Sequence, residues 1–320
     1  MALKPSGRIV VAGSIVMDLS VVTGAIPRAG ETAFGSRFEL GFGGKGANQA
    51  AAASLCGAEV SMIGRVGDDL FGPAAVRDMA SFGIDVSRVR VERGASTGAA
   101  CVLVDPRGQN RIMVVKGAND ALSPADLRGA VPALNKADFV LLQLEIPFET
   151  VYAAMSLAKS AGARVVLNAA PATRGLDARR AAAADYLIVN ESEGESLSGI
   201  RVRGSRSARA CAGRLLKSGY AAVILTLGVR GCLLARPGSM VAIRGFPART
   251  VDATGAGDAF IGSFAAFLAR GIPEREALSR ASFYAALSTE KFGTRKSYPG
   301  LREFERSWGR PRGAHGRKRP

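Results

Sequence analysis

The sequence predicts an α/β fold of three layers: a mostly parallel sheet with helices on both faces, and a small β lid beside it. Two observations support this prediction. Short apolar runs alternate with helical patterns along most of the chain, which is typical of parallel strands connected by helices. Two segments, at about 20–39 and 99–116, break the alternation and resemble hairpins. We expect these hairpins to form the lid.

The elements are expected in the following order. The first strand is the apolar run at 8–13, which ends at a glycine. Further strands are predicted at 60–64, 139–144, 165–168, 186–189 and 221–227, and helices at 70–82 and 150–160. The second lid hairpin contains the turn Pro106-Arg107-Gly108. Residues 1–308 are expected to form one domain.

The cysteine and histidine content excludes several classes of enzyme. The cysteines, Cys56, Cys101, Cys211 and Cys232, lie far apart, and the single histidine, His315, lies in the C-terminal tail. A Cys/His zinc site and histidine catalysis are therefore not expected. Neither a signal peptide nor a membrane span is visible, so we expect a cytoplasmic protein with reduced thiols and no membrane partner.

The chain is strongly basic. The formal net charge is +16, and the tail at 309–320 carries basic residues without an acid, so we expect this tail to be disordered. The arginines between 201 and 209 have no aromatic residues between them, and only 6% of all residues are aromatic. We therefore expect no nucleic acid as the primary partner, while the positive field favours anionic nucleotides.

A glycine-rich loop opens an apolar helical run at 251–269. Gly255, Ala256 and Gly257 have little or no side chain, so backbone N–H groups converge at a helix N-terminus and form an anion cradle. Asp258 stands beside this cradle, where phosphoryl transfer would use it as the base for an attacking hydroxyl. A plain helix cap with a flexible turn is the alternative explanation.

A second glycine-rich segment lies at 41–49. It formally matches the dinucleotide pattern G-x-G-x-x-G, but it does not follow the first strand of the sheet. It fails as a Walker A loop, because Lys45 is followed by Gly46 and position 39 is Glu39. What remains is a glycine platform with one lysine and one amide, which suits a small polyhydroxy ligand.

Polar side chains follow the ends of the expected strands. Because the carboxyl ends of parallel strands meet at one edge of a sheet, these residues describe a site there. They are Asp18, Glu145, Asn168, Asn190 with Glu193, and Thr226.

Four motifs resemble the landmarks of the ribokinase-like (PfkB) family of sugar kinases, in the same order and at similar spacing. They are GGKGANQA at 43–50, NESE at 190–193, TLGVRG at 226–231 and DATGAGD at 252–258. The likeness covers about residues 8–299 and is closest to ribokinases. It implies transfer of the γ-phosphoryl group of ATP to the primary hydroxyl of a pentose, with D-ribose as the leading substrate and with Mg²⁺ and K⁺ as cofactors. Dimerisation through the lid is common among such kinases, and no residue here decides it.

The resemblance also implies roles for individual residues. Asp258 would be the catalytic base, with Gly255, Ala256 and Gly257 as the anion hole. The sugar would be held by Asp18, Gly44, Lys45, Gly46, Asn48, Glu145 and Asp258. The nucleotide would be bound by Asn190, Thr226, Gly228, Gly231, Gly257 and Ser282. Glu193 would hold Mg²⁺ through water, and a monovalent cation would be held by Asp252, Thr254, Ser288, Lys291, Gly293 and Ser297, partly through backbone carbonyls.

One position departs from the ribokinase pattern. Val16 stands where ribokinases usually carry an asparagine that reaches a sugar hydroxyl. Burial of a hydroxyl against valine costs a few kcal/mol without another partner, which favours 2-deoxyribose or another modified sugar as the alternative substrate. Two distant alternatives are a dinucleotide-dependent oxidoreductase, which leaves Asp258 unused, and a non-catalytic polyanion binder, which uses only the charge.

Overall fold

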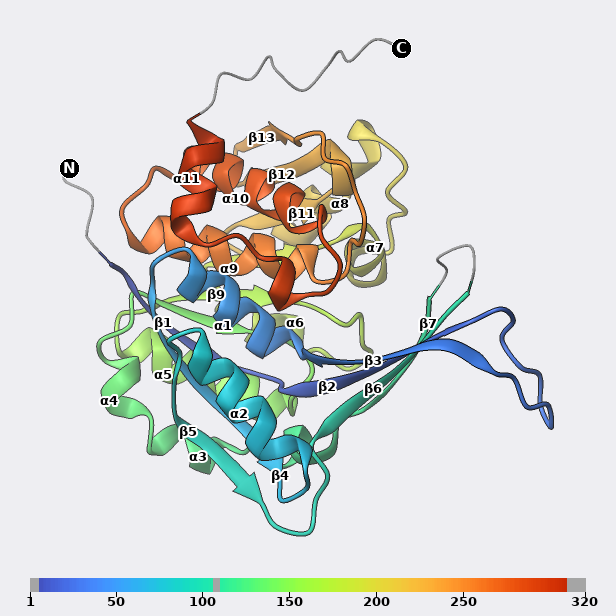
Figure 1. The fold of residues 1–320 in the computed structure, drawn as a ribbon. Helices are drawn as coiled ribbons and strands as arrows, with labels where there is room; N and C mark the ends of the chain where they lie inside the picture. The colour runs from blue at the N-terminus through green and yellow to red at the C-terminus, as the bar shows by residue number, and fades with distance from the viewer. Residues whose placement is uncertain (1–5, 106–109, 310–320) are drawn as a thin grey trace, which may run out of the picture.

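The computed structural model describes residues 6–105 and 110–309, and within them the strands form two sheets. The larger sheet has nine strands in the order β13-β12-β11-β10-β9-β8-β1-β4-β5 (Figure 1). The strands from β5 to β11 in this order are all parallel, which confirms the predicted fold class. They are β1 (Arg8–Ala12), β4 (Glu59–Gly67), β5 (Asp85–Glu92), β8 (Phe139–Leu142), β9 (Arg164–Asn168), β10 (Tyr186–Val189) and β11 (Val223–Thr226).

Helices cover both faces of this sheet. One face carries α1 (Lys45–Leu55), α2 (Phe71–Ser81), α9 (Ala256–Ala269), α10 (Glu274–Ser288) and α11 (Leu301–Trp308). The other carries α3 (Pro124–Arg128), α4 (Val131–Leu134), α5 (Phe148–Ser160), α6 (Ala178–Ala181), α7 (Glu191–Ser198) and α8 (Ser205–Lys217). Short 3-10 turns are η1 (Gly117–Ala121), η2 (Gly228–Arg230) and η3 (Arg295–Ser297).

The two cores explain why the central strands are continuously apolar. Val11 of β1 and Leu141 of β8 enter the core under α1, α9 and α10. Their neighbours Val10 and Val140 enter the core on the opposite face. Successive side chains of a strand point to opposite faces, so a strand covered on both sides buries every residue.

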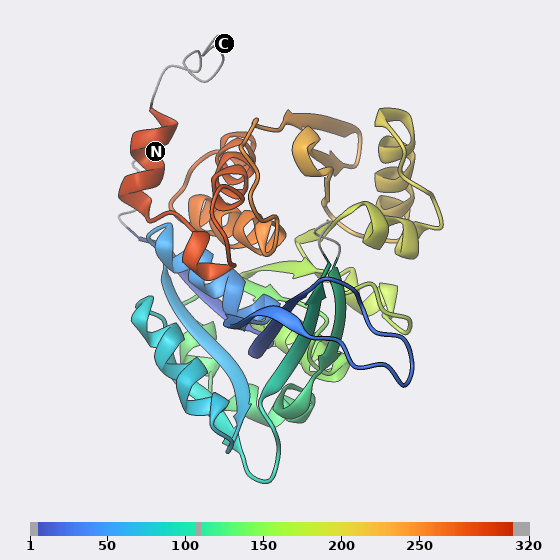
Figure 2. The same cartoon turned by 45° about the vertical axis from the view of Figure 1, so that its right-hand side comes forward.

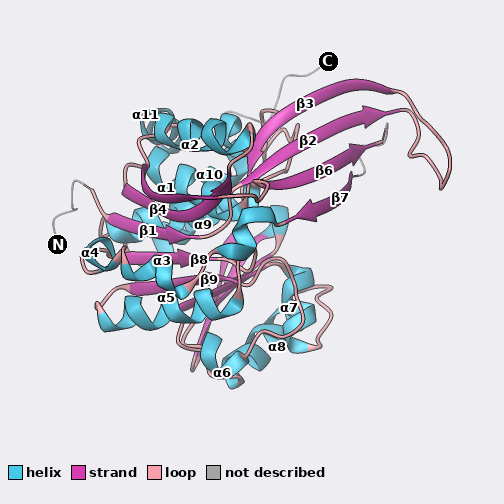
Figure 3. Cartoon of the chain, turned by 90° about the horizontal axis from the view of Figure 1, so that it is seen from below, coloured by secondary structure: helices cyan, strands magenta, loops and turns pink. Residues whose placement is uncertain are grey.

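The lid is a four-stranded sheet in the order β3-β2-β6-β7, and Figure 3 shows it projecting to one side of the main sheet. Its strands are β2 (Val16–Thr23), β3 (Gly35–Gly43), β6 (Gly98–Val104) and β7 (Asn110–Val115). The first pair therefore extends further toward the main sheet than the expected 20–39, and both Val16 and Asp18 lie on a lid strand. The expected turn at 106–108 lies outside the described residues.

Three strands were not predicted. The edge strand β5 is mostly exposed and carries several charged residues, so its sequence contains no continuous apolar run. The antiparallel strands β12 (Gly231–Arg236) and β13 (Ser239–Arg244) extend the other edge. Within the described ranges, we find no helix long and apolar enough to span a membrane. Residues 310–320 of the expected disordered tail lie outside those ranges.

Elements that are distant in sequence meet at the base of the lid. In Figure 2, the blue N-terminal helix α1 lies beside the orange and red C-terminal segments. These are α9 and η3, both of which contact α1. The lid base therefore adjoins the start of α9, where the glycine-rich loop and Asp258 are located.

Candidate active site

The polar residues that follow the parallel strands converge at the carboxyl edge of the sheet. Ser14 follows β1 and donates a hydrogen bond from its hydroxyl to Glu145, which follows β8. The same carboxylate accepts a hydrogen bond from the backbone N–H of Lys45, at 3.0 Å. Glu145 therefore ties the end of β8 to the start of α1.

Asp258 lies at the centre of this edge. It occupies the first turn of α9 and is only 7% exposed. Its Oδ2 accepts a hydrogen bond from Asn48 Nδ2, and its Oδ1 accepts one from Gln49 Nε2, each at 3.0 Å. The structure thus brings the glycine platform of α1 and the glycine-rich loop of α9 into one site.

The loop before Asp258 requires glycine at its N-cap. Gly255 has a φ of 77°, and a Cβ at this position would lie 2.2 Å from the Thr294 side chain. The Tyr298 hydroxyl donates a 2.8 Å hydrogen bond to the Gly255 carbonyl, which helps to hold the loop in place. Because α9 begins without a side-chain cap and Gly257 is exposed, this helix end is open to an anion.

Burial and charge shift the titration of these groups. Burial raises the pKa of Asp258, while the Lys45 ammonium and the two amide hydrogen bonds oppose the rise. Burial lowers the pKa of Lys45, but the carboxylates of Asp258, Glu145 and Glu193 outweigh it, so the net pKa is raised. The lysine is therefore held as a cation among carboxylates.

Asp18 faces the same site from the lid. Its carboxylate lies over Gly43, where a Cβ would come within 2.2 Å of its Oδ2. Burial raises the pKa of Asp18 to about 6, with Arg295 lowering it and Glu145 and Asp258 raising it. The sugar-site candidates Asp18, Gly44, Lys45, Gly46, Asn48 and Glu145 thus gather around Asp258.

The expected nucleotide-site residues lie on neighbouring strand ends. Asn190 caps α7 and forms a capping box with Glu193, whose carboxylate accepts the Asn190 N–H at 2.8 Å. Burial raises the pKa of Glu193, Lys45 lowers it and Asp258 raises it, so this carboxylate lies near the central cluster. Thr226 ends β11, with Gly228 and Gly231 in the turn that follows. Ser282 is buried on α10 beside Cys232 of β12.

The six candidates for a monovalent-cation site come from two loops that the structure brings together. Asp252 joins them, because its carboxylate accepts the N–H of Thr254 at 2.9 Å and that of Gly293 at 3.0 Å. The Lys291 ammonium lies 3.1 Å from Glu303 on α11, so it is paired away from these loops. Ser288 and Ser297 donate their hydroxyls to backbone carbonyls, which leaves oxygen lone pairs for a cation.

The metal candidates fit hard cations held by oxygen. Across residues 6–105 and 110–309, we find no group of three or more His, Cys, Asp or Glu side chains placed to bind a metal. A lone carboxylate such as Glu193 suits Mg²⁺, which keeps several waters and uses few protein ligands. The loops around Asp252 offer carbonyl and hydroxyl oxygens, which suit a weakly bound monovalent cation.

Several residues that hold the site together were not identified from the sequence. Arg295 is 3% exposed and forms an ion pair with Asp78 of α2 at 2.7 Å. Its Nε also donates to the carbonyl of Phe42 in the lid, at 3.1 Å. An arginine in a polar loop carries no local sign of such burial. Gln143 is a better signal, because an amide inside an otherwise apolar strand end must find a partner.

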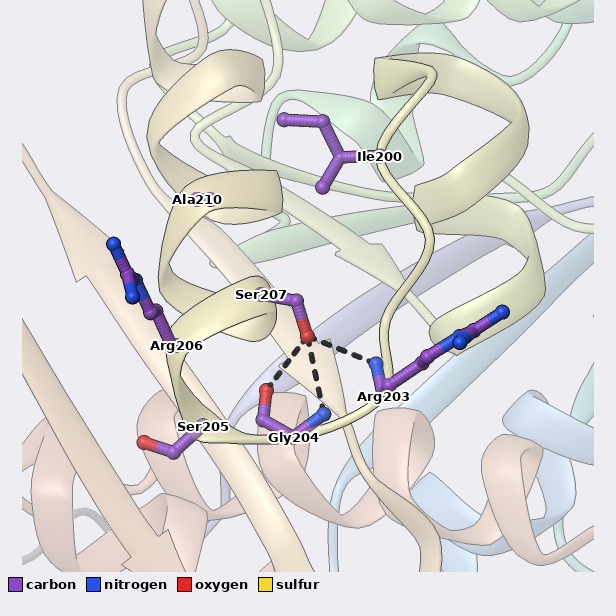
Figure 4. Close-up of a pocket in the computed structure, with 7 residues that line it drawn as sticks. All are labelled: Ile200, Arg203, Gly204, Ser205, Arg206, Ser207 and Ala210. Carbon is purple, nitrogen blue, oxygen red and sulfur yellow. Dashed lines mark hydrogen bonds between the residues drawn. The ribbon is translucent and has the colours of Figure 1, made fainter.

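The basic segment at 201–209 does not form a second anion site. Figure 4 shows a shallow pocket at the start of α8, where Arg203 and Arg206 point away from one another. The Ser207 hydroxyl oxygen accepts hydrogen bonds from the backbone N–H groups of Arg203 and Gly204, at 2.9 and 3.1 Å. These N–H groups at the start of α8 therefore already have a partner within the chain. The charge of this segment is therefore spread over the surface.

An open helix N-terminus, a buried carboxylate beside it and further carboxylates near that group at the base of the lid form the arrangement that phosphoryl transfer to a hydroxyl group requires. Comparison with known proteins agrees. Residues 6–300 match the family model described as pfkB family carbohydrate kinase, and the chain belongs to this family. It is therefore a phosphotransferase that acts on a hydroxyl group.

Relatives with assigned activities lie close in sequence and structure. The deoxyribokinase of Salmonella typhi is 39% identical over 296 residues, covering 92% of this chain and 97% of that protein. The ribokinase of Mus musculus is 37% identical over 300 residues, covering 92% and 93%. The structure of Arabidopsis thaliana ribokinase with ribose and ATP superimposes with a TM-score of 0.90 at 29% identity, covering 96% of this chain and 100% of that one.

Proposed function

We propose that this protein transfers the γ-phosphoryl group of ATP to the primary hydroxyl of D-ribose and produces ribose 5-phosphate. The observation that carries this proposal is the placement of Asp258. Its buried carboxylate is held by Asn48 and Gln49 at the open N-terminus of α9. The related ribokinases support ribose and ATP as the substrates.

In the proposed reaction, Asp258 accepts the proton of the sugar hydroxyl as its oxygen forms a bond to the γ-phosphorus. The bond from that phosphorus to the leaving oxygen of ADP breaks in the same step. The backbone of Gly255, Ala256 and Gly257 would stabilise the charge on the transferring group. Asn48 Oδ1 is buried and has no hydrogen-bond partner among the described residues, so it is free to accept a hydrogen bond from a sugar hydroxyl.

The remaining roles follow the same arrangement. The nucleotide would contact Asn190, Thr226, Gly228, Gly231, Gly257 and Ser282. Glu193 would hold Mg²⁺ through water, and the bound ion would neutralise phosphate charge. The loops joined by Asp252 would hold a monovalent cation, for which K⁺ is the candidate. Lys45 would help to hold the sugar, and its charge would also offset the surrounding carboxylates.

A specific observation favours 2-deoxyribose as a second candidate substrate. Val16 is 4% exposed and lies two residues before Asp18 on β2, so both side chains are on the same face of the strand. A valine there supplies no hydrogen bond to a sugar hydroxyl. The likeness to deoxyribokinases at 39% identity points in the same direction.

We further propose a cytoplasmic homodimer that forms through the lid. The lid exposes large apolar side chains, which a second copy of the chain would cover. They are Phe38, Leu40, Ile112, Met113, Val114 and Val115, each at least half exposed. Neither a membrane nor a nucleic acid is required by this proposal.

The proposal is tested by Mg-ATP-dependent phosphorylation of ribose, 2-deoxyribose, fructose and pseudouridine, with and without K⁺. We expect a pentose to give the highest kcat/KM. The variant Asp258→Asn keeps the shape of the side chain and should lower kcat at least ~100-fold while both substrates still bind. Turnover of Asp258→Asn near the wild-type level would show that another residue is the base.

A further inference from the structure

The side-chain amide of Gln49 forms hydrogen bonds with three other side chains. It is completely buried in α1, and its Nε2 lies 3.0 Å from Asp258 Oδ1 and 3.2 Å from Asn168 Oδ1. Its Oε1 accepts a hydrogen bond from Gln143 Nε2 at 2.7 Å. The amide thus donates toward the carboxylate and accepts on its other side.

The neighbours of Gln49 fix the direction of its amide. Asn168 donates its Nδ2 to the backbone carbonyl of Ile188 at 3.2 Å, and a carbonyl can only accept. The Oδ1 of Asn168 must then face Gln49, so that both Asn168 and Asp258 present acceptors to it. Only the NH₂ end of Gln49 satisfies two acceptors, and Gln143 stabilises the same orientation by donating to its oxygen.

We propose that Gln49 is a positioning residue for Asp258, an inference that rests on the proposed function. It would hold Oδ1 in place so that Oδ2 faces the reacting hydroxyl. Asn48, which binds Oδ2, would also bind sugar under the proposed function. Gln49 is completely buried and donates a hydrogen bond to Asp258, so it would act on the carboxylate without touching the substrate.

The charged groups around Asp258 make this support important. Asp18, Glu145 and Glu193 are carboxylates near Asp258, on the lid, at the end of β8 and on α7. The buried Tyr298 hydroxyl also lies near it. Lys45 is the cation that faces it. Neutral donors on both oxygens favour the ionised carboxylate that a base requires, and loss of one would favour its protonated form.

The test compares four variants with the wild type. Gln49→Met removes the donor at similar volume. Gln49→Glu keeps the shape but places a second carboxyl group against Asp258. Gln143→Met removes the group that orients the amide. Cys56→Ala is the matched control, because Cys56 is buried at the end of the same helix and its hydrogen-bond partner is Tyr284.

We expect Gln49→Met to lower kcat by about 10- to 100-fold and to leave both KM values within about 3-fold of the wild type. The acid limb of its kcat profile should move to higher pH, because a hydrogen bond to the charged carboxylate is lost. Gln49→Glu should lose most activity at high pH and regain part of it as pH falls, since only protonated glutamic acid can donate. Gln143→Met should show a smaller loss of kcat, and Cys56→Ala should keep the wild-type kcat profile.

The outcomes separate this inference from the proposed function. If Asp258→Asn is inactive but Gln49→Met keeps kcat within about 2-fold and the wild-type pH profile, the positioning role is refuted while the proposed base stands. A pH-independent kcat in Gln49→Glu at the wild-type level would also refute it, because shape alone would then suffice. If the wild type phosphorylates no sugar, both proposals fail.

Discussion

Asp18 allows a quantitative prediction of stability, because the buried carboxylate that would bind the sugar destabilises the folded protein when it is ionised. The carboxylate lies in the lid base with its pKa raised to about 6 by burial, in spite of the nearby Arg295 guanidinium. A buried carboxyl group with a raised pKa destabilises the folded protein whenever it is ionised. The variant Asp18→Asn removes that charge and should therefore stabilise the fold at neutral pH.

The magnitude follows from the folded and unfolded pKa values. The folded pKa of about 6 exceeds the ordinary value of 3.8 by about 2.2, and each pH unit corresponds to about 1.4 kcal/mol. The ionised Asp18 thus costs at most about 3 kcal/mol. Below pH 3.8 both states are protonated and the cost is absent. Between pH 3.8 and about 6 the folded state binds the proton more tightly, so stability is lost as pH rises through this window.

The assay is urea unfolding of the wild type and Asp18→Asn at several pH values from 4 to 8, with the slope m compared to confirm the same transition. We expect the free energy of unfolding of Asp18→Asn, relative to wild type, to increase by about 2 to 3 kcal/mol between pH 4 and pH 7. Asp120→Asn is the control, because Asp120 is 61% exposed in its pair with Lys116 and should change stability by less than about 0.5 kcal/mol. A difference between Asp18→Asn and wild type that does not depend on pH would refute the reasoning.

Two further predictions concern specificity and the anion loop. Val16→Asn adds a hydrogen-bonding group beside Asp18 and should raise the ratio of kcat/KM for ribose over 2-deoxyribose by about 10-fold or more, measured on both sugars; an unchanged ratio would place the sugar elsewhere. Tyr298→Phe removes the 2.8 Å hydrogen bond to the Gly255 carbonyl and should cost about 1 to 3 kcal/mol in urea unfolding, together with a several-fold loss of kcat. Wild-type values for both quantities would show that the loop does not depend on this hydroxyl.

The parts of the fold that the sequence predicted are those whose environment leaves a local pattern. The strands β8 and β10 are buried on both faces, so their residues form continuous apolar runs. The edge strand β5 has one neighbour and exposed charges, so its sequence resembles a surface segment. The expected bounds of the first lid pair, 20–39, are too narrow, because β2 begins before Asp18 and β3 continues into the glycine-rich segment.

The same distinction applies to the site. The loop before Asp258 was found because glycines, a carboxylate and a helix start are adjacent in the sequence. Contacts between distant residues leave no such signal. Gln49 and Asp258 are 209 residues apart, and Arg295 and Phe42 are 253 apart. Such pairs become visible only when the helices α1 and α9 pack together and bring η3 to the lid base.

The loop at 288–298 explains how one segment supports both halves of the site. Through Arg295 it is hydrogen bonded to the Phe42 carbonyl at the lid base, and through Tyr298 to the Gly255 carbonyl of the anion loop. Through Gly293 it is bound to Asp252, at the start of that loop. A change in the geometry of this segment must therefore move the lid base and the anion loop together. The monovalent cation proposed above, if bound near Asp252, would therefore act on turnover by fixing this segment.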